Sequence, residues 1–370
     1  MKNYLVETIP PGSYFSRPVY LDEEFVLAAP EMRFSWDLMK AVEKWEFKTV
    51  TSGGEPRKNY TVENSGEAAF GERECIKQAE EFYKDFRESV EEFFRQAESA
   101  GEVNFNTAVE TIKSSLDIIR EDRRYLLRIQ KNTGPGKEQN YLITHTVWST
   151  IIALIIGMYL KLPIHRLIEL GVSALFHEIG MIKLPPEIYL SNRPLSPVDR
   201  RTMLTHTLLG YNLLKSSNFP LSVCIGALEH HERENGSGYP RRLTSDKISL
   251  YSKIIAVACS YEALSSHRPH REAKDGYTGM LELLKNEGNQ YNETVVQALV
   301  YSLSIYPIGL YVLLSDGKQG QVVDVNPEKP RFPVVQILGE FTPQGLNRTL
   351  ETSEDGIRIE RPLTWEEMGV

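Results

Sequence analysis

The chain has 370 residues, of which 41% are hydrophobic and 25% charged, and its formal net charge at pH 7 is −8. This length predicts two or three domains, and the acidic balance argues against a general DNA-binding or membrane-surface protein, because such proteins need clustered Lys and Arg. Its three cysteines, Cys75, Cys224 and Cys259, are too few and too scattered for a disulfide framework, so we expect a reducing, cytoplasmic setting.

The first segment, residues 1 to about 60, predicts a small α+β unit. Residues 14–21 and 25–29 have the composition of strands, residues 35–46 have a helical pattern, and residues 48–52 form a closing strand before the turn GGEP. The initial MKNYLVETIPPGSYF lacks a basic stretch followed by an apolar core, so no secretory signal is expected.

Residues 61–136 predict a helical connector with two amphipathic helices, from about Ala68 to Ser99 and from about Thr107 to Lys131. Apolar residues recur at spacings of three and four in both segments. Two interpretations stay open: the apolar stripes pack against a core, or they form a connector that dimerises or transmits a signal to a protein partner.

Residues 137–306 predict an all-α domain, because helical segments alternate with Pro and Gly turns. The most apolar segment, Val147–Leu160, is shorter than the roughly 20 residues of a bilayer span, so we expect a buried core helix and no membrane association. Residues 307–370 alternate apolar runs with Asp-Gly, Gln-Gly and Asn-Pro turns, which predicts a short C-terminal β-meander and tail. The expected fold class is therefore mostly α, an all-helical domain flanked by two smaller β-containing parts.

Five of the eight histidines form an ordered series in the α domain, each near an expected helix end. Imidazoles that converge from separate helices indicate a site for cations such as iron, manganese or zinc. Glu178, which directly follows a histidine, is the natural candidate for a carboxylate that bridges two ions. The five histidines are His145, His177, His206, His230 and His231.

This order, followed by ENGSGYP and RPHR, resembles the HD-GYP branch of the HD-domain phosphohydrolases. The resemblance covers about residues 137–340, including YPIGLYVLLSDGKQGQVV. It implies an all-α fold that holds two divalent metal ions, with iron first and manganese or zinc as alternatives. It also implies hydrolysis of the bacterial messenger cyclic di-GMP to the linear dinucleotide or to GMP.

The resemblance also implies roles for individual residues. Gly238, Tyr239 and Pro240 would shape the substrate wall, while Arg268 and Arg271 match the positions that grip phosphate. Metal ligation is implied for His145, His177, Glu178, His206, His230 and His231.

Three positions depart from the family pattern and predict a reduced activity. Glu178 replaces the aspartate of the HD pair, and Cys259 replaces a later aspartate ligand. A thiolate can ligate and favours a softer metal, but Cys259 can also be read as a small buried residue. Met181 occupies the position of a phosphate-binding lysine, which Lys183 replaces only if the turn points it inward.

Tyr141, one helical turn before His145, stands where family members with a third metal carry an acidic residue, so two metals are the most we expect. The leading hypothesis is a metal-dependent cyclic di-GMP phosphodiesterase in which Glu178 and Lys183 take part in catalysis. Two alternatives stay open: a degenerate member that binds cyclic di-GMP or a protein partner without efficient turnover, and a generic HD phosphohydrolase.

Overall fold

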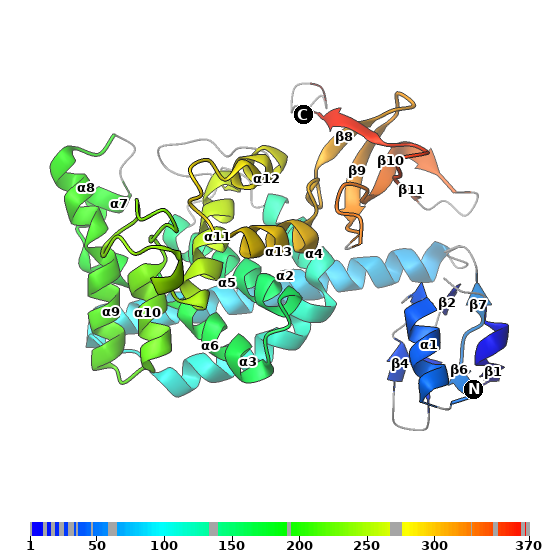
Figure 1. Cartoon of the computed structure of the whole chain (residues 1–370), viewed down its shortest axis with the longest axis horizontal. Coiled ribbons are helices and arrows are strands. Elements are labelled where there is room, and N and C mark those ends of the chain that lie inside the picture. The colour runs from blue at the N-terminus through cyan, green and yellow to red at the C-terminus, as the bar shows by residue number, and fades with distance from the viewer. Residues whose placement is uncertain are drawn as a thin grey trace. The chain divides into compact units, whose positions relative to one another are not determined.

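The computed structural model divides the chain into two units, Met1–Ala69 and Phe70–Val370 (Figure 1). Each unit is described by itself. The structure describes residues 2–9, 13–15, 19–21, 26–28, 33–34, 36–45, 47–57, 65–132, 140–190, 194–266, 276–326, 328–342, 347–363 and 367.

The first unit confirms the predicted α+β composition. Its strands form a four-stranded sheet in the order β1-β6-β3-β4 and a three-stranded sheet in the order β5-β2-β7. A core of its own includes Phe15, Phe34, Val42 and Val50, all with side chains at most 1% exposed. The elements are β1 (Lys2–Leu5), a 3₁₀ turn (Val6–Thr8), β2 (Ser13–Phe15), β3 (Val19–Tyr20), β4 (Val26–Ala28), β5 (Arg33–Phe34), α1 (Trp36–Lys44), β6 (Thr49–Ser52) and β7 (Pro56–Arg57).

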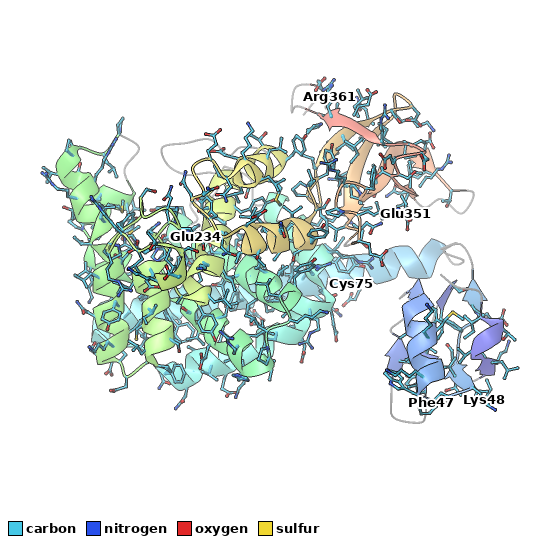
Figure 2. The ribbon with its side chains drawn as sticks, in the orientation of Figure 1. Phe47, Lys48, Cys75, Glu234, Glu351 and Arg361 are labelled. Carbon is cyan, nitrogen blue, oxygen red and sulfur yellow. The ribbon has the colours of Figure 1, made fainter. Side chains whose placement is uncertain are left out.

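The second unit is mostly helical and ends in an antiparallel sheet. Its longest helix is α2, which begins at Ser65 in the first unit and belongs to this unit from Phe70 onward; Figure 2 labels Cys75 on it. The helices are α2 (Ser65–Ala100), α3 (Phe105–Glu121), α4 (Arg123–Asn132), α5 (Tyr141–Tyr159), α6 (Ile164–Leu175), α7 (Pro186–Tyr189), α8 (Pro197–Leu204), α9 (His206–Ser216), α10 (Leu221–Glu229), α11 (Leu250–Ser265), α12 (Gly276–Lys285) and α13 (Glu293–Leu303), with short 3₁₀ segments at Ile179–Lys183 and Ser245–Lys247.

The second predicted helix of the connector is divided in two. Asp122 has φ −102° and ψ 17°, so it ends α3, and its carbonyl then accepts the backbone N–H groups of Tyr125 and Leu126 at the start of α4. The apolar stripes of α2 and α3 are buried in the core of this unit, with Val90 and Ile112 both 0% exposed. Core packing therefore accounts for the amphipathic pattern of both helices.

Helix α5 is the central helix of this unit. It packs against α6, α11 and α13, and it is the one described helix long and apolar enough to cross a membrane. Since 83% of its most apolar window is buried within the protein, the prediction of a core helix is confirmed. The helix begins at Tyr141, earlier than the apolar run, and so it also carries His145.

The C-terminal sheet confirms the predicted β-meander and adds one strand. Strands β8 to β11 follow one another as antiparallel neighbours, and β12 returns to pair with β8 at the other edge. Arg124 of α4 lies 3.5 Å from Asp324 of β9, an ion pair between the helices and this sheet. The strands are β8 (Tyr311–Leu314), β9 (Gln319–Asp324), β10 (Val334–Phe341), β11 (Asn347–Glu351) and β12 (Ile359–Pro362).

Candidate metal centre

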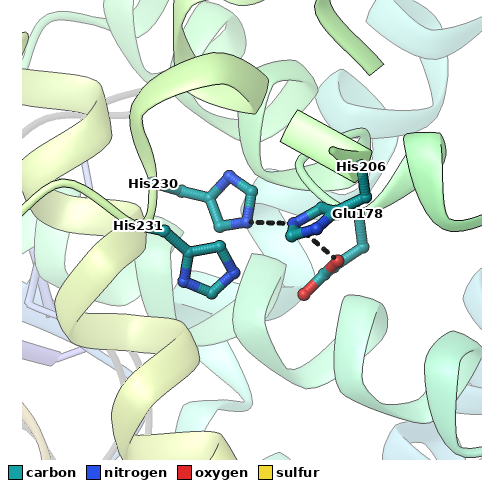
Figure 3. Close-up of side chains that lie close together, drawn as sticks. All are labelled: Glu178, His206, His230 and His231. Carbon is teal, nitrogen blue, oxygen red and sulfur yellow. Dashed lines mark hydrogen bonds and ion pairs between the residues drawn. The ribbon is translucent and has the colours of Figure 1, made fainter. Parts of the chain in front are cut away.

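The structure brings the five predicted histidines and Glu178 together, although they come from separate helices. His145 lies on α5, His177 and Glu178 follow α6, His206 begins α9, and His230 and His231 follow α10. Their potential ligand atoms form two groups, within each of which the atoms lie no more than 4.8 Å apart. The first group is Glu178, His206, His230 and His231 (Figure 3), and the second is His145, His177 and Cys259.

Hydrogen bonds to the backbone orient three of these imidazoles. The Nδ1 atoms of His177, His206 and His230 lie 2.6, 2.6 and 3.0 Å from the carbonyl oxygens three residues earlier. A carbonyl can only accept, so each Nδ1 carries the proton and Nε2 is the atom left for a ligand. This arrangement is typical of metal-ligating histidines.

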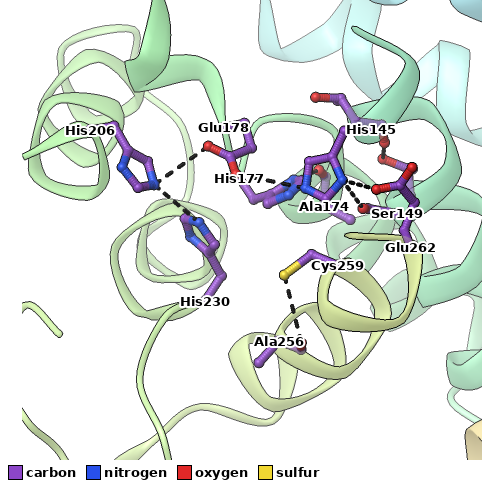
Figure 4. A network of polar contacts seen from close by, with 12 residues as sticks. His145, Ser149, Ala174, His177, Glu178, His206, His230, Ala256, Cys259 and Glu262 are labelled. Carbon is purple, nitrogen blue, oxygen red and sulfur yellow. Dashed lines mark hydrogen bonds and ion pairs between the residues drawn. The ribbon is translucent and has the colours of Figure 1, made fainter. Parts of the chain in front are cut away.

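His145 is oriented by a carboxylate. Its Nδ1 donates to Glu262, a residue of α11 that is 1% exposed, and the hydroxyl of Ser149 lies 3.4 Å from the same nitrogen (Figure 4). Its Nε2 therefore faces the centre, 3.7 Å from Glu178 Oε1. A carboxylate behind a ligating histidine raises the basicity of that ligand.

Glu178 lies between the two groups. Its Oε1 faces His145 and its Oε2 lies 3.5 Å from His206 Nε2, so its two oxygens are directed at imidazoles of different groups. The side chain is buried, and a buried carboxylate needs compensation by a cation or by hydrogen-bond donors. Its placement suits a carboxylate shared by two ions.

Burial keeps several of these imidazoles neutral. It lowers the pKa of His177 to about 4, and it lowers the pKa of His230 and of His231 well below 6.5. The neutral imidazole is the form that binds a metal ion.

The Nε2 atoms meet in a way that a cation would satisfy. His206 Nε2 lies 3.3 Å from His230 Nε2 and 3.5 Å from Glu178 Oε2, and with the imidazole protons on Nδ1 all three of these atoms are acceptors. His177 Nε2 is buried and has no hydrogen-bond partner among the described residues. Divalent cations held among these atoms would pair all of these lone pairs, so the residues present fit a metal centre.

Gly180 explains how the turn after Glu178 approaches α9. A Cβ atom at this position would lie 1.9 Å from the carbonyl oxygen of His206 and 2.5 Å from the backbone nitrogen of Gly210. No side chain fits there, so the glycine lets the turn that carries His177 and Glu178 lie against the start of α9.

The predicted substrate wall stands beside the first group. The ring of Tyr239 stacks on His231, with centroids 4.7 Å apart and planes 23° apart, and burial raises the pKa of its hydroxyl. A Cβ atom at Gly238 would lie 2.5 Å from the carbonyl oxygen of His231, so this glycine allows the chain to fold back on itself. Pro240 follows Tyr239 through a cis peptide bond.

Two buried glutamates that the sequence reasoning missed hold this wall in place. Glu232 accepts the backbone N–H groups of Arg241 and Leu243 at 2.7 and 2.9 Å. Glu229 pairs with Arg241 and accepts the N–H of Ser249 at 3.0 Å. A third glutamate, Glu234, stands two positions after Glu232 and pairs with Lys253 at 2.9 Å; it is labelled in Figure 2. These carboxylates flank His230 and His231 in the sequence, a signal that could have identified them.

Glu262 was missed as well. It was recognisable as the one charged residue between Lys253 and the end of the apolar helix α11, three positions after Cys259.

Met181 is buried and Lys183 is exposed at the end of its 3₁₀ segment. Arg268 and Arg271 lie outside the described residues.

Comparison with known proteins identifies related sequences. Residues 128–295 match the HD domain family model. The cyclic di-GMP phosphodiesterase PdeB of Borreliella burgdorferi is 25% identical over 90% of this chain and 86% of its own length. A cyclic di-GMP phosphodiesterase of Pseudomonas aeruginosa is 26% identical over 68% of this chain and 60% of its own length. One of Thermotoga maritima is 37% identical over 36% of each chain.

Proposed function

Since the chain belongs to the HD-GYP family of HD-domain proteins, we propose that it is a metal-dependent phosphodiesterase that hydrolyses cyclic di-GMP. The observation that supports this most is the meeting of Glu178 with the inward-facing Nε2 atoms of His145 and His206, at 3.7 and 3.5 Å. One carboxylate between two sets of imidazoles is the arrangement that a pair of ions requires.

We propose that the centre holds two divalent ions, with iron first and manganese or zinc as alternatives. Two ions at such a site supply a nucleophile from water at neutral pH and neutralise charge on the phosphoryl oxygens. Glu178 would bridge them, His206, His230 and His231 would hold one, and His145, His177 and Cys259 would hold the other. Glu178 could serve both groups because one of its oxygens lies 3.7 Å from His145 Nε2 and the other 3.5 Å from His206 Nε2.

The chain's own residues then position the substrate. Tyr239, stacked on His231, would form one wall of the substrate site together with its neighbours Gly238 and Pro240, and Gly238 lets the backbone fold back against His231. Arg268 and Arg271 would hold the phosphates as bidentate partners. Lys183 would take part only if the segment that carries it turned inward on substrate binding, since its side chain is exposed.

The setting and partners of the enzyme are further parts of the proposal. The free cysteines fit a reducing compartment, and we therefore place the enzyme in the cytoplasm. A homodimer or a signalling partner that engages α2 and α3 would have to use their exposed faces, because their apolar faces are buried in the core.

The deciding experiment is anaerobic incubation of iron-loaded protein with cyclic di-GMP, followed by chromatography of the products. We expect the linear dinucleotide or GMP. His177→Ala should lose both bound metal and activity, whereas His165→Ala, which changes an exposed histidine of α6, should keep both. Binding of cyclic di-GMP without any product would replace this proposal by that of a receptor. Retained metal stoichiometry in His177→Ala would refute the assignment of that ligand.

A further inference from the structure

The two groups of potential ligands differ in their chemistry. The first group, Glu178 with three imidazoles, offers only oxygen and nitrogen. The second group offers two imidazoles and the sulfur of Cys259, and all three of its side chains are buried. Ligand softness decides which metal a site prefers, since thiolates favour zinc and ferrous iron, and carboxylates suit manganese. The two halves of the centre are therefore unequal.

Cys259 is placed as a ligand would be. It lies on α11, is 4% exposed, and its sulfur lies within 4.8 Å of the ligand nitrogens of His145 and His177. Figure 4 draws Cys259 together with these two imidazoles. Its contact within the helix is with the Ala256 carbonyl oxygen, at 3.6 Å.

His177 supplies an independent sign that an ion belongs beside this sulfur. Its ring is fully buried, Nδ1 is bonded to the Ala174 carbonyl oxygen, and Nε2 has no hydrogen-bond partner among the described residues. A buried acceptor left in this state costs about 1–3 kcal/mol. A cation bound beside this nitrogen would remove that cost, and the sulfur of Cys259 lies within 4.8 Å of the same nitrogen.

We propose that Cys259 binds metal as a thiolate and makes the second subsite selective for zinc or ferrous iron over manganese. The first subsite offers only nitrogen and oxygen, so it lacks the ligand that gives the second its preference for softer ions. Glu262, which accepts a hydrogen bond from His145, increases the electron donation of that imidazole to the same ion. This inference rests on the metal dependence in the proposed function and concerns a ligand and a selectivity that activity alone does not reveal.

The test is the absorption spectrum of the metal-free full-length chain titrated with Co²⁺ under anaerobic conditions. A thiolate ligand gives a sulfur-to-cobalt charge-transfer band in the near ultraviolet. We expect this band in the unmodified chain and its loss in Cys259→Ser. Cys224→Ser is the matched control, because Cys224 is also a buried, free cysteine of this unit and lies outside both ligand groups. The band should persist in that variant.

A second variant keeps the inference testable if Cys259→Ser fails to fold. Cys259→Asp restores a charged ligand, and in an equimolar mixture of zinc and manganese it should bind more manganese than the unmodified chain does. Absence of the charge-transfer band from the unmodified chain, or its persistence in Cys259→Ser, would overturn the thiolate assignment. If Cys259→Asp bound no more manganese from the mixture than the unmodified chain does, the proposed selectivity would be overturned.

These outcomes are separable from those of the proposed function. The spectrum and the metal content are measured without cyclic di-GMP. A chain that shows the band and hydrolyses nothing would keep the thiolate subsite and lose the phosphodiesterase proposal. A chain that hydrolyses cyclic di-GMP without showing the band would keep the phosphodiesterase proposal and lose the thiolate subsite.

Discussion

Acidification should destabilise the metal-free protein through His177. Burial lowers the pKa of this imidazole to about 4 from its usual 6.5, so the unfolded chain takes up the proton first. The stabilising contribution of the neutral imidazole is therefore complete above pH 6.5 and is lost as the pH falls toward 4. One pKa unit corresponds to about 1.4 kcal/mol, so this group alone should lower the free energy of unfolding by about 2 kcal/mol between pH 7 and pH 5. Burial of His230 and His231 acts in the same direction.

The assay is urea denaturation of the metal-free chain at pH 7 and at pH 5, followed by the helical circular dichroism signal. His177→Ala removes the titrating group, so its free energy of unfolding should fall by about 2 kcal/mol less than that of the unmodified chain over this interval. His165→Ala, which changes an exposed histidine, should retain the full pH dependence. An identical pH dependence in His177→Ala and the unmodified chain would falsify the assignment of His177 as a buried neutral imidazole.

Three substitutions test the construction of the site. Gly180→Ala should destabilise the protein by about 1–3 kcal/mol and lower its metal content, measured by thermal melting and metal analysis, because the added Cβ meets the backbone of His206. Glu232→Gln should raise KM for cyclic di-GMP more than it lowers kcat, since it loosens the Tyr239 wall; the exposed Glu287→Gln is its control. Cys259→Asp should raise turnover with manganese if metal coordination limits it; an unchanged rate would direct attention to the position of Met181.

The centre could be predicted from the sequence because its residue types have few other uses in that pattern. Five histidines near helix ends, with one glutamate next to His177, come together once the helices pack around α5. The core helix was predictable for a similar reason, since its apolar run leaves no polar face for solvent. The predicted all-α domain begins at residue 137, and within the described residues its first helix starts at Tyr141, directly after the N-cap Asn140.

Features that depend on tertiary contacts could not be predicted in the same way. The break at Asp122 carries no proline or glycine, and the separation of α8 from α9 at Thr205 is equally unmarked. Glu262 acts through His145, which lies 117 positions earlier, so no local pattern connects them. The direction of Lys183 depends on how its short 3₁₀ segment packs, and the structure leaves that side chain exposed.

The departures from the family pattern are related by their position in the centre. Glu178 has one methylene more than aspartate, and its two oxygens are directed at His145 and His206, one in each ligand group. Cys259 belongs to the second group only, where a thiolate would hold an ion at about 2.3 Å compared with about 2.0–2.2 Å for a carboxylate oxygen. Oε1 of Glu178 lies 3.7 Å from His145, which belongs to the same group as Cys259, so we infer that one substitution accommodates the other. On this reasoning Glu178→Asp should impair metal binding in the unmodified chain more than in Cys259→Asp, and metal titration of the double-mutant cycle measures that coupling.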